Sequence, residues 1–160
     1  MKPSYVDGVD NSKYVSKLLN KRVLVLGGTS GVGFCVAEAA VEHGAHVMIS
    51  GSRQTKLDNA LTRLKAAYPE KSANVRGQTC DLSEPEQLES CLKELLQATA
   101  GDSKIDHIVF TAGPAHKIVP ISEASVEDIL RPGRVRFLGP LVLGKIARNT
   151  WRVVRNPPSP

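Results

Sequence analysis

Short runs of apolar residues alternate along this 160-residue chain with longer segments in which apolar residues recur at helical spacing. Buried strands give short continuous apolar runs, whereas amphipathic helices give apolar stripes with a period near 3.6 residues. We therefore predict strands over 22–26, 45–50, 74–80 and 105–111, and helices over 31–43, 54–67 and 84–98. Gly44 and Pro69 mark the ends of the first two helices, and Pro85 suits the first turn of the third.

The order of these elements favours one fold class. Strand and helix alternate at the spacing of right-handed crossover connections, which place successive strands parallel in one sheet. The chain is long enough for one domain with its own hydrophobic core. We therefore predict an α/β protein with a doubly wound parallel sheet, whose helices cover both faces.

The pattern loosens after Gly113. Residues 122–130 start a helix, and the Arg-Pro-Gly at 131–133 should interrupt or kink it, because Pro and Gly are the poorest helix formers. Residues 136–147 return to a helical, apolar pattern. These features divide the chain into a lead-in over 1–20, a domain over 21–150 and a Pro-rich tail over 151–160 that we expect to be disordered.

Charge changes this picture only near the C-terminal end. The net charge is +5, but residues 131–160 hold seven Arg or Lys and no acid, so the first 130 residues hold 14 bases and 16 acids, net −2. No nucleic-acid motif or aromatic interleaving accompanies the basic stretch, so we expect no nucleic-acid partner. No apolar run approaches the roughly 20 residues of a membrane span, and the polar N-terminus lacks the apolar stretch of a signal peptide. We expect a cytoplasmic protein with no membrane partner.

Residues for a disulfide framework or a metal site are few. Cys35, Cys80 and Cys91 are odd in number and form no Cys-x-x-Cys pair, so we interpret them as reduced and mostly packed. The four His residues are scattered without the spacing of metal ligands. The sequence therefore predicts no metal site.

The stretch VLVLGGTSGVG, residues 23–33, is rich in glycine and lies between the first predicted strand and helix. A helix N-terminus offers unpaired N–H groups and a partial positive charge, and glycine lets a pyrophosphate approach them closely. Gly27 permits the tight turn, Gly31 permits the approach of the phosphates and Gly33 lets the helix pack on the strand. A plain strand–helix turn is the alternative, but it needs fewer glycines. We predict a dinucleotide-binding loop.

The glycine spacing GxxxGxG resembles that of the short-chain dehydrogenase/reductase family. Three later segments resemble the family in the same order, namely Asp81-Leu82, Thr111-Ala112-Gly113 and the FLGP at 137–140. The resemblance implies a partial Rossmann sheet with strand order 3-2-1-4, capped by helix over 122–150. The candidate cofactor-binding residues are Gly27, Thr29, Ser30, Gly31, Val32, Gly33, Ser50, Ser52, Arg53, Asp81, Leu82, Thr111, Ala112 and Gly113.

The end of the second strand indicates which dinucleotide is preferred. An NAD site places Asp or Glu about 20 residues after the glycine loop to hold the ribose 2′-hydroxyl, but residues 50–54 read SGSRQ. Arg53 can instead meet a 2′-phosphate by a charge-assisted contact, and Ser50 and Ser52 can supply hydroxyls. A solvated Arg53 is the alternative, but a cation at a helix start is mildly unfavourable. We therefore predict NADP(H) as the cofactor.

The family resemblance also implies hydride transfer, with a Tyr as acid, a Lys four residues later, and helping Ser and Asn residues. None of the three Tyr residues, Tyr5, Tyr14 and Tyr68, is followed by Lys at that spacing. Thr111 and Arg136 occupy the two positions where the family places Asn. We therefore expect the residues that bind the cofactor in this family, whereas the catalytic residues stay unknown.

Three interpretations follow from this mixture. The chain is a truncated reductase of secondary metabolism, an atypical member, or a non-catalytic dinucleotide-binding or interaction protein. The atypical pattern is similar to that of family members in fungal indole-alkaloid pathways, some of which reduce an iminium and assist a cyclisation without the usual Tyr and Lys. Arg131 or Arg136 could then position a small-molecule substrate, although surface charge is the simpler interpretation. The open edge of the fourth strand and the apolar FLGPLVLGKI helix favour a homo-oligomer.

Overall fold

The computed structural model of the chain describes residues 17–114 and 118–152. Within these residues a parallel sheet contains β1 (Arg22–Leu26), β2 (His46–Gly51), β3 (Val75–Thr79) and β4 (His107–Phe110), in the order β3-β2-β1-β4. This order and the parallel pairing confirm the predicted fold class. Residues 23–26 of the central strand β1 are all buried, as a continuous apolar run requires.

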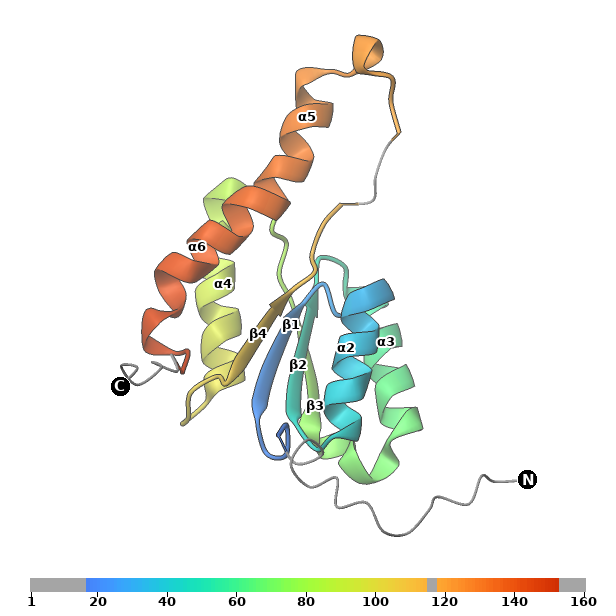
Figure 1. The fold of residues 1–160 in the computed structure, drawn as a ribbon, viewed down its shortest axis with the longest axis vertical. Coiled ribbons are helices and arrows are strands. Elements are labelled where there is room, and N and C mark those ends of the chain that lie inside the picture. The colour runs from blue at the N-terminus through green and yellow to red at the C-terminus, as the bar shows by residue number, and fades with distance from the viewer. Residues whose placement is uncertain (1–16, 115–117, 153–160) are drawn as a thin grey trace, which may run out of the picture.

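Helices cover both faces of the sheet, as Figure 1 shows. The helices α2 (Gly31–Glu42) and α3 (Gln54–Ala67) lie on one face, and α4 (Pro85–Ala100) and α6 (Gly139–Ile146) lie on the other. Each layer buries its own apolar cluster against the sheet, so the molecule has two cores separated by the strands. No helix in the described parts of the chain is long and apolar enough to cross a membrane.

The chain stays helical through the Arg-Pro-Gly at 131–133. The helix α5 (Val126–Gly133) includes this tripeptide and continues into a π-helical segment, Arg134–Leu138, and then into α6. We predicted an interruption or a kink: the interruption is wrong, and the winding changes from α to π directly after the tripeptide. Pro inside a helix costs a hydrogen bond and changes the local winding, and here a bidentate ion pair from Arg134 to Glu127 spans the Pro position at 2.7 and 3.0 Å.

The start of the predicted tail pairs with the edge of the sheet. Trp151 forms a parallel bridge to Ile105, and the N–H of Arg152 donates to the carbonyl of Ile105 at 2.8 Å. These two residues therefore belong to the folded domain, at the outer side of the segment that leads into β4. The rest of the predicted tail, 153–160, and residues 1–16 of the lead-in lie outside the described residues.

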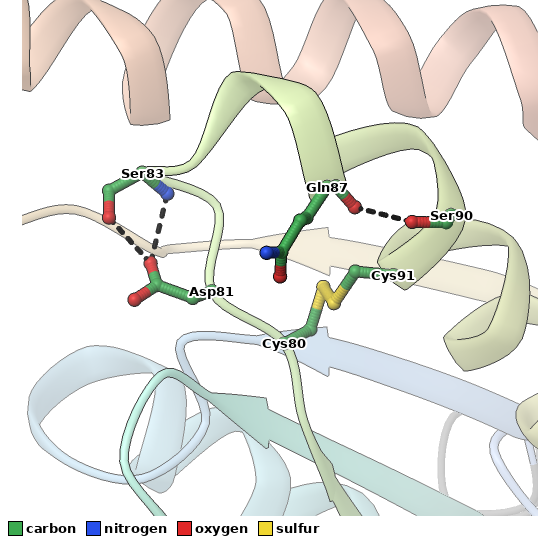
Figure 2. Close-up of a disulfide and its surroundings, with 6 residues drawn as sticks. All are labelled: Cys80, Asp81, Ser83, Gln87, Ser90 and Cys91. Carbon is green, nitrogen blue, oxygen red and sulfur yellow. Dashed lines mark hydrogen bonds between the residues drawn. A yellow bond between two sulfur atoms is a disulfide. The ribbon is translucent and has the colours of Figure 1, made fainter.

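The cysteines differ from the sequence interpretation. Cys80 and Cys91 are joined by a disulfide, and Cys35 is free and exposed. The expectation of reduced cysteines is therefore wrong for Cys80 and Cys91 and confirmed for Cys35, whereas the expectation of packing is wrong for Cys35. The sequence contains no sign of the pair, because it arises only when α4 brings Cys91 against the residue that follows β3 (Figure 2).

Asp106 joins the start of β1 to the start of β4. Its Oδ2 accepts the backbone N–H of Arg22 at 3.0 Å, and its Oδ1 lies 3.6 Å from Nζ of Lys21 and 3.2 Å from Nε of Arg152. Burial disfavours the charged carboxylate, but the hydrogen bond from Arg22 and the nearby positive charges outweigh it. The pKa of Asp106 therefore lies below its usual value of 3.8.

We predict that Asp106→Asn lowers the free energy of unfolding by about 1–2 kcal/mol at neutral pH, a modest loss because Lys21 and Arg152 are largely exposed. The folded-state pKa is depressed, so the carboxylate stabilises the fold above pH 3.8. That contribution disappears as the pH falls through the lower folded-state pKa. Urea unfolding followed by circular dichroism across this pH range measures the difference.

The matched control for this prediction is Asp102→Asn, which changes an exposed carboxylate in the turn after α4. It should leave the unfolding free energy unchanged. A deficit of Asp106→Asn that stays constant down to strongly acidic pH would show that the charge of Asp106 has no part in stability.

Candidate functional site

Four loops meet at the carboxyl edge of the sheet, where parallel α/β proteins bind ligands. They follow the four strands and comprise residues 27–30, 52–53, 80–84 and 111–114. The Ser50 carbonyl accepts the N–H groups of Gly27 and Gly28 at 2.9 and 3.1 Å, so the first two loops are bonded together. The structure therefore brings all the candidate cofactor-binding residues to one edge of the sheet.

Each glycine of the loop meets a different environment. Gly27 has a φ of 86°, and a Cβ there would lie 2.6 Å from the backbone nitrogen of Ala112. A Cβ on Gly33 would overlap the Gly27 carbonyl and the Thr111 hydroxyl. Gly31 has a φ of 56°, and no heavy atom lies within 4 Å of its Cβ position. Gly27 and Gly33 are therefore required by packing, whereas Gly31 borders open space.

The N-terminus of α2 borders the same open space. Ser30 caps the helix with extended backbone but makes no side-chain capping bond, and the first turn contains no acidic residue. Val32 is 73% exposed, so the first turn faces solvent. The N–H groups and the partial positive charge at this end of α2 are consequently available to an anion. Thr29 precedes Ser30, and its side chain lies against the end of β2: a Cβ added to Gly51 would lie 2.7 Å from the Thr29 Cγ2.

The three residues predicted to contact a 2′-phosphate lie at or just after the end of β2, but they differ in exposure. Ser50 is only 2% exposed, and its carbonyl is bonded to the glycine loop. Ser52 and Arg53 are exposed, and Arg53 is the N-cap of α3, whose first turn has no acidic residue. Ser52 and Arg53 are thus placed to contact a ligand, whereas Ser50 is placed to hold the loop.

The loop after β3 is closed by its own side chains (Figure 2). Asp81 accepts hydrogen bonds at Oδ1 from the N–H of Ser83 at 2.9 Å and from the Ser83 hydroxyl at 2.7 Å. The Leu82 side chain is 6% exposed and packs into the core with Cys80. Asp81 therefore presents a carboxylate at the edge, while Leu82 offers only its backbone.

Thr111 and Arg136 meet at the end of β4. The Thr111 hydroxyl donates to the carbonyl of Leu26 at 3.0 Å, which ties β4 to β1. The Arg136 guanidinium lies directly over Gly113, because a Cβ on Gly113 would come within 2.6 Å of its Nε. Ala112 between them is half-buried. Arg136 is exposed, as the surface-charge interpretation expects, but it also faces the candidate site.

A tyrosine acid is not found near this edge within residues 17–114 and 118–152. Tyr68 follows the C-terminal end of α3, at the opposite edge of the sheet. Burial and the nearby Glu42, Glu38 and Glu70 raise its pKa, which makes Tyr68 a poorer proton donor at neutral pH. Tyr5 and Tyr14 lie outside the described residues. The same described ranges contain no cluster of His, Cys, Asp and Glu that could hold a metal ion.

One concave surface of the described residues lies away from this edge. A groove of about 420 Å³ lies between α2 and the outer part of the sheet and is lined mainly by apolar side chains, including Val36, Ala40, Val109 and Trp151. It does not include the glycine loop or the carboxyl edge.

Comparison with known proteins gives a consistent result. A model of the SDR-like Rossmann domain, where SDR denotes short-chain dehydrogenase/reductase, matches residues 14–155. Short-chain dehydrogenase/reductase malC of Malbranchea aurantiaca is 46% identical over 131 residues, which cover 81% of this chain and 49% of that protein. Short-chain dehydrogenase/reductase fsr5 of Gibberella fujikuroi is 44% identical over 137 residues, which cover 85% of this chain and 52% of that protein. The chain thus spans about half the length of these relatives.

Solved structures show the same fold. The MalC Reductase/Diels-Alderase from Malbranchea aurantiaca matches with a TM-score of 0.79 at 42% identity, over 87% of this chain and 54% of that one. A short chain dehydrogenase from Escherichia coli CFT073, complexed with NADPH, matches with a TM-score of 0.69 over 84% of this chain and 55% of that one. Its identity is 20%, so this second likeness concerns the fold alone.

We predict that Gly33→Ala lowers the free energy of unfolding by about 3 kcal/mol. The Gly27 backbone and the Thr111 side chain can make room for the new Cβ only if a strand shifts. Gly31→Ala is the matched control. Its Cβ meets open space, so only the strain of a positive φ remains, about 1 kcal/mol. Urea denaturation ranks the two variants, and an equal or larger loss for Gly31→Ala would contradict the packing role of Gly33.

Proposed function

The chain belongs to the short-chain dehydrogenase/reductase family, and we propose that it binds NADP(H) at the carboxyl edge of its sheet, as the cofactor half of a cytoplasmic oxidoreductase of secondary metabolism. The proposal rests above all on the open space at Gly31 beside the N-terminus of α2. The chain's relatives malC and fsr5 are short-chain dehydrogenases/reductases from fungi, and one of the matching structures is a reductase. These names support an oxidoreductase of secondary metabolism.

The open space suits a pyrophosphate. A phosphate at this point would meet backbone N–H groups of the first turn of α2 and the positive end of its dipole. The absence of a side chain on Gly31 leaves the backbone approachable, and the hydroxyls of Thr29 and Ser30 lie on the same loop. No acidic residue of the first turn opposes the anion.

The end of β2 supports NADP(H) over NAD(H). Arg53 is exposed at the start of α3 and Ser52 precedes it, so a 2′-phosphate on the adenosine ribose would gain a charge-assisted bond. An NAD site would instead need a carboxylate there for the 2′-hydroxyl. Residues 50–54 contain none.

At the other end of the cofactor, Thr111, Gly113 and Arg136 would face the nicotinamide half, because Thr111 and Gly113 follow β4 and the Arg136 guanidinium lies over Gly113. NADPH supplies a hydride when bound. The chain's own residues position that hydride donor, and the Arg136 guanidinium over Gly113 adds a fixed positive charge that can orient a carbonyl or carboxylate oxygen of a small substrate.

We predict that the protein binds NADPH at least tenfold more tightly than NADH, and that Arg53→Ala removes this preference. A charge-assisted contact contributes about 1.5–3 kcal/mol, which corresponds to a tenfold or larger change in affinity. Isothermal titration of both cofactors into wild type and variant measures it. Equal affinities in the wild type, or no change in Arg53→Ala, would overturn the assignment of the cofactor.

Gly31→Val separates the cofactor preference from the site itself. Its side chain would fill the space at the phosphate position, so it should abolish binding of both cofactors while leaving the circular dichroism spectrum unchanged. Retained binding of NADPH by a folded Gly31→Val protein would place the cofactor elsewhere.

We predict that this chain reduces ordinary ketones poorly, because no Tyr-xxx-Lys is present to protonate the oxygen. General acid help contributes about 10²–10⁴-fold to such reactions. A cyclic iminium ion already carries positive charge at the acceptor and needs no proton donor, so it should be the better substrate. Stopped-flow measurement of NADPH oxidation against ketones, aldehydes and iminium ions tests this.

The outcomes of that kinetic test separate the proposed activities. Rapid turnover of ordinary ketones would contradict the prediction and require another side chain that donates a proton to the ketone oxygen. Turnover of iminium ions alone supports the reductase. Tight NADPH binding with no turnover of any substrate would favour a non-catalytic dinucleotide-binding protein.

The long helix gives a reason to expect self-association. Val126, Ile129, Leu130, Phe137 and Leu141 recur at helical spacing along α5 and α6 and are all exposed. Large apolar patches on one face mark interaction surfaces. We propose that this face packs against a second copy of the chain, so light scattering at tens of micromolar should show a dimer or larger species. Phe137→Glu should shift it toward monomer, and a sharp monomer peak for the wild type would contradict the proposal.

A further inference from the structure

We propose that Cys80 and Cys91 form a redox-reversible disulfide that sets how tightly the adenosine end of the cofactor site binds NADPH. This inference rests on the proposed function, because it concerns the loop after β3 in that site. It adds a modification site whose reaction partner is a low-molecular-weight thiol or dithiol.

The disulfide connects two elements that border the site. Cys80 follows β3 directly, and Cys91 lies in the second turn of α4, as Figure 2 shows. Their Cα atoms are 5.6 Å apart, within the range of native disulfides. The N–H of Cys80 also donates to the carbonyl of Gly51 at 3.1 Å. Cys80 is thus the point at which the end of β2, the loop over 80–84 and α4 are joined.

The loop that the disulfide anchors lies beside the end of β2, where Arg53 would meet the 2′-phosphate of the adenosine ribose, and is therefore the candidate adenosine contact. Asp81 follows Cys80 immediately, and its carboxylate is held by Ser83 in a two-residue turn. The other fixed points of the loop are the Gly51 bond and the buried Leu82 side chain. Opening the disulfide would remove the covalent anchor next to Asp81 while leaving these weaker attachments in place.

The two cysteines of the disulfide differ in exposure. Cys91 is half-buried, whereas Cys80 is only 4% exposed. An external thiolate would therefore attack Sγ of Cys91, forming a mixed disulfide and releasing the Cys80 thiolate, which takes up a proton. A second thiolate then attacks the external sulfur of the mixed disulfide. It releases the Cys91 thiolate, which is protonated in turn, and yields the oxidised external disulfide, so two electrons pass from the external thiols to the protein.

The expected consequence is a change in affinity. With the disulfide closed, the 80–84 loop is already ordered before the cofactor binds. With the disulfide open, the cofactor must order the loop when it binds. The conformational entropy that the loop then loses makes the binding free energy less favourable. We expect the reduced protein to bind NADPH about fivefold more weakly than the oxidised protein.

The test uses the whole chain with Cys35→Ser, which removes the exposed free thiol and prevents disulfides between molecules. Isothermal titration measures the affinity for NADPH and for 2′,5′-ADP, which carries only the adenosine end, after oxidation with glutathione disulfide and after reduction with dithiothreitol. Mass spectrometry after thiol alkylation counts the open cysteines in each sample. Adding Cys91→Ser to this background gives a permanently open form that should resemble the reduced sample and ignore the redox treatment.

The proposal predicts a fivefold weaker affinity of the reduced form for both ligands, together with faster hydrogen exchange of residues 80–84 without ligand. Equal affinities in samples shown to be open and closed would overturn it, as would two free thiols after oxidation. Loss of binding in every form would contradict the proposed cofactor site instead. The hydrogen exchange of the loop would then still decide whether the disulfide anchors it.

Discussion

The close packing of Gly33 against the Gly27 carbonyl and the Thr111 hydroxyl fixes where α2 begins, and the candidate site depends on that position. Only a residue without a side chain lets the first turn of α2 approach the ends of β1 and β4 so closely. The approach directs the N–H groups of that turn toward the open space at Gly31. The same Thr111 hydroxyl is bonded to the carbonyl of Leu26, so helix, loop and both strands are held by one compact set of contacts.

The parallel sheet extends this local arrangement into a site. Because all carboxyl ends lie on one edge, segments far apart in the sequence become neighbours there. Arg53 enters from the end of β2, Asp81 from the end of β3, and Arg136 reaches Gly113 from the long helix. The chain spans about half the length of its relatives. Its described part contains the edge that we propose binds the dinucleotide, with no tyrosine beside it. The proposed preference for cationic acceptors follows from this pairing of a proposed cofactor edge with no tyrosine at that edge.

Local patterns were sufficient to predict the elements of the sheet. Apolar runs identified β1, β2 and β4, and their alternation with amphipathic helices gave the parallel sheet, whereas the strand order came from the family resemblance. The roles of Gly27 and Gly33 also followed from spacing, because a tight turn and a close helix need glycine at fixed offsets. These features depend on neighbours in sequence, which is why a single sequence contains the signal for them.

Features that depend on tertiary contacts escaped prediction. The Cys80–Cys91 disulfide arises because α4 brings Cys91 against the residue that follows β3, and the burial of Ser50 accompanies its bonds to the glycine loop. The low helix propensity around Pro132 did not break the helix, whose winding changes after Gly133 while an ion pair from Arg134 to Glu127 spans the Pro position. Arg136 had one usable signal, its place just before FLGP, but only the fold shows its guanidinium over Gly113.

The central claim is that the glycine loop and the neighbouring strand ends form the NADPH site. Chemical-shift mapping by two-dimensional NMR of the labelled chain during titration with NADPH tests it most directly. The account predicts that the largest amide shifts occur at residues 27–33, 52–53, 81–83 and 111–113. Shifts confined to the apolar groove near Val36, Val109 and Trp151, or no saturable shifts at all, would contradict it.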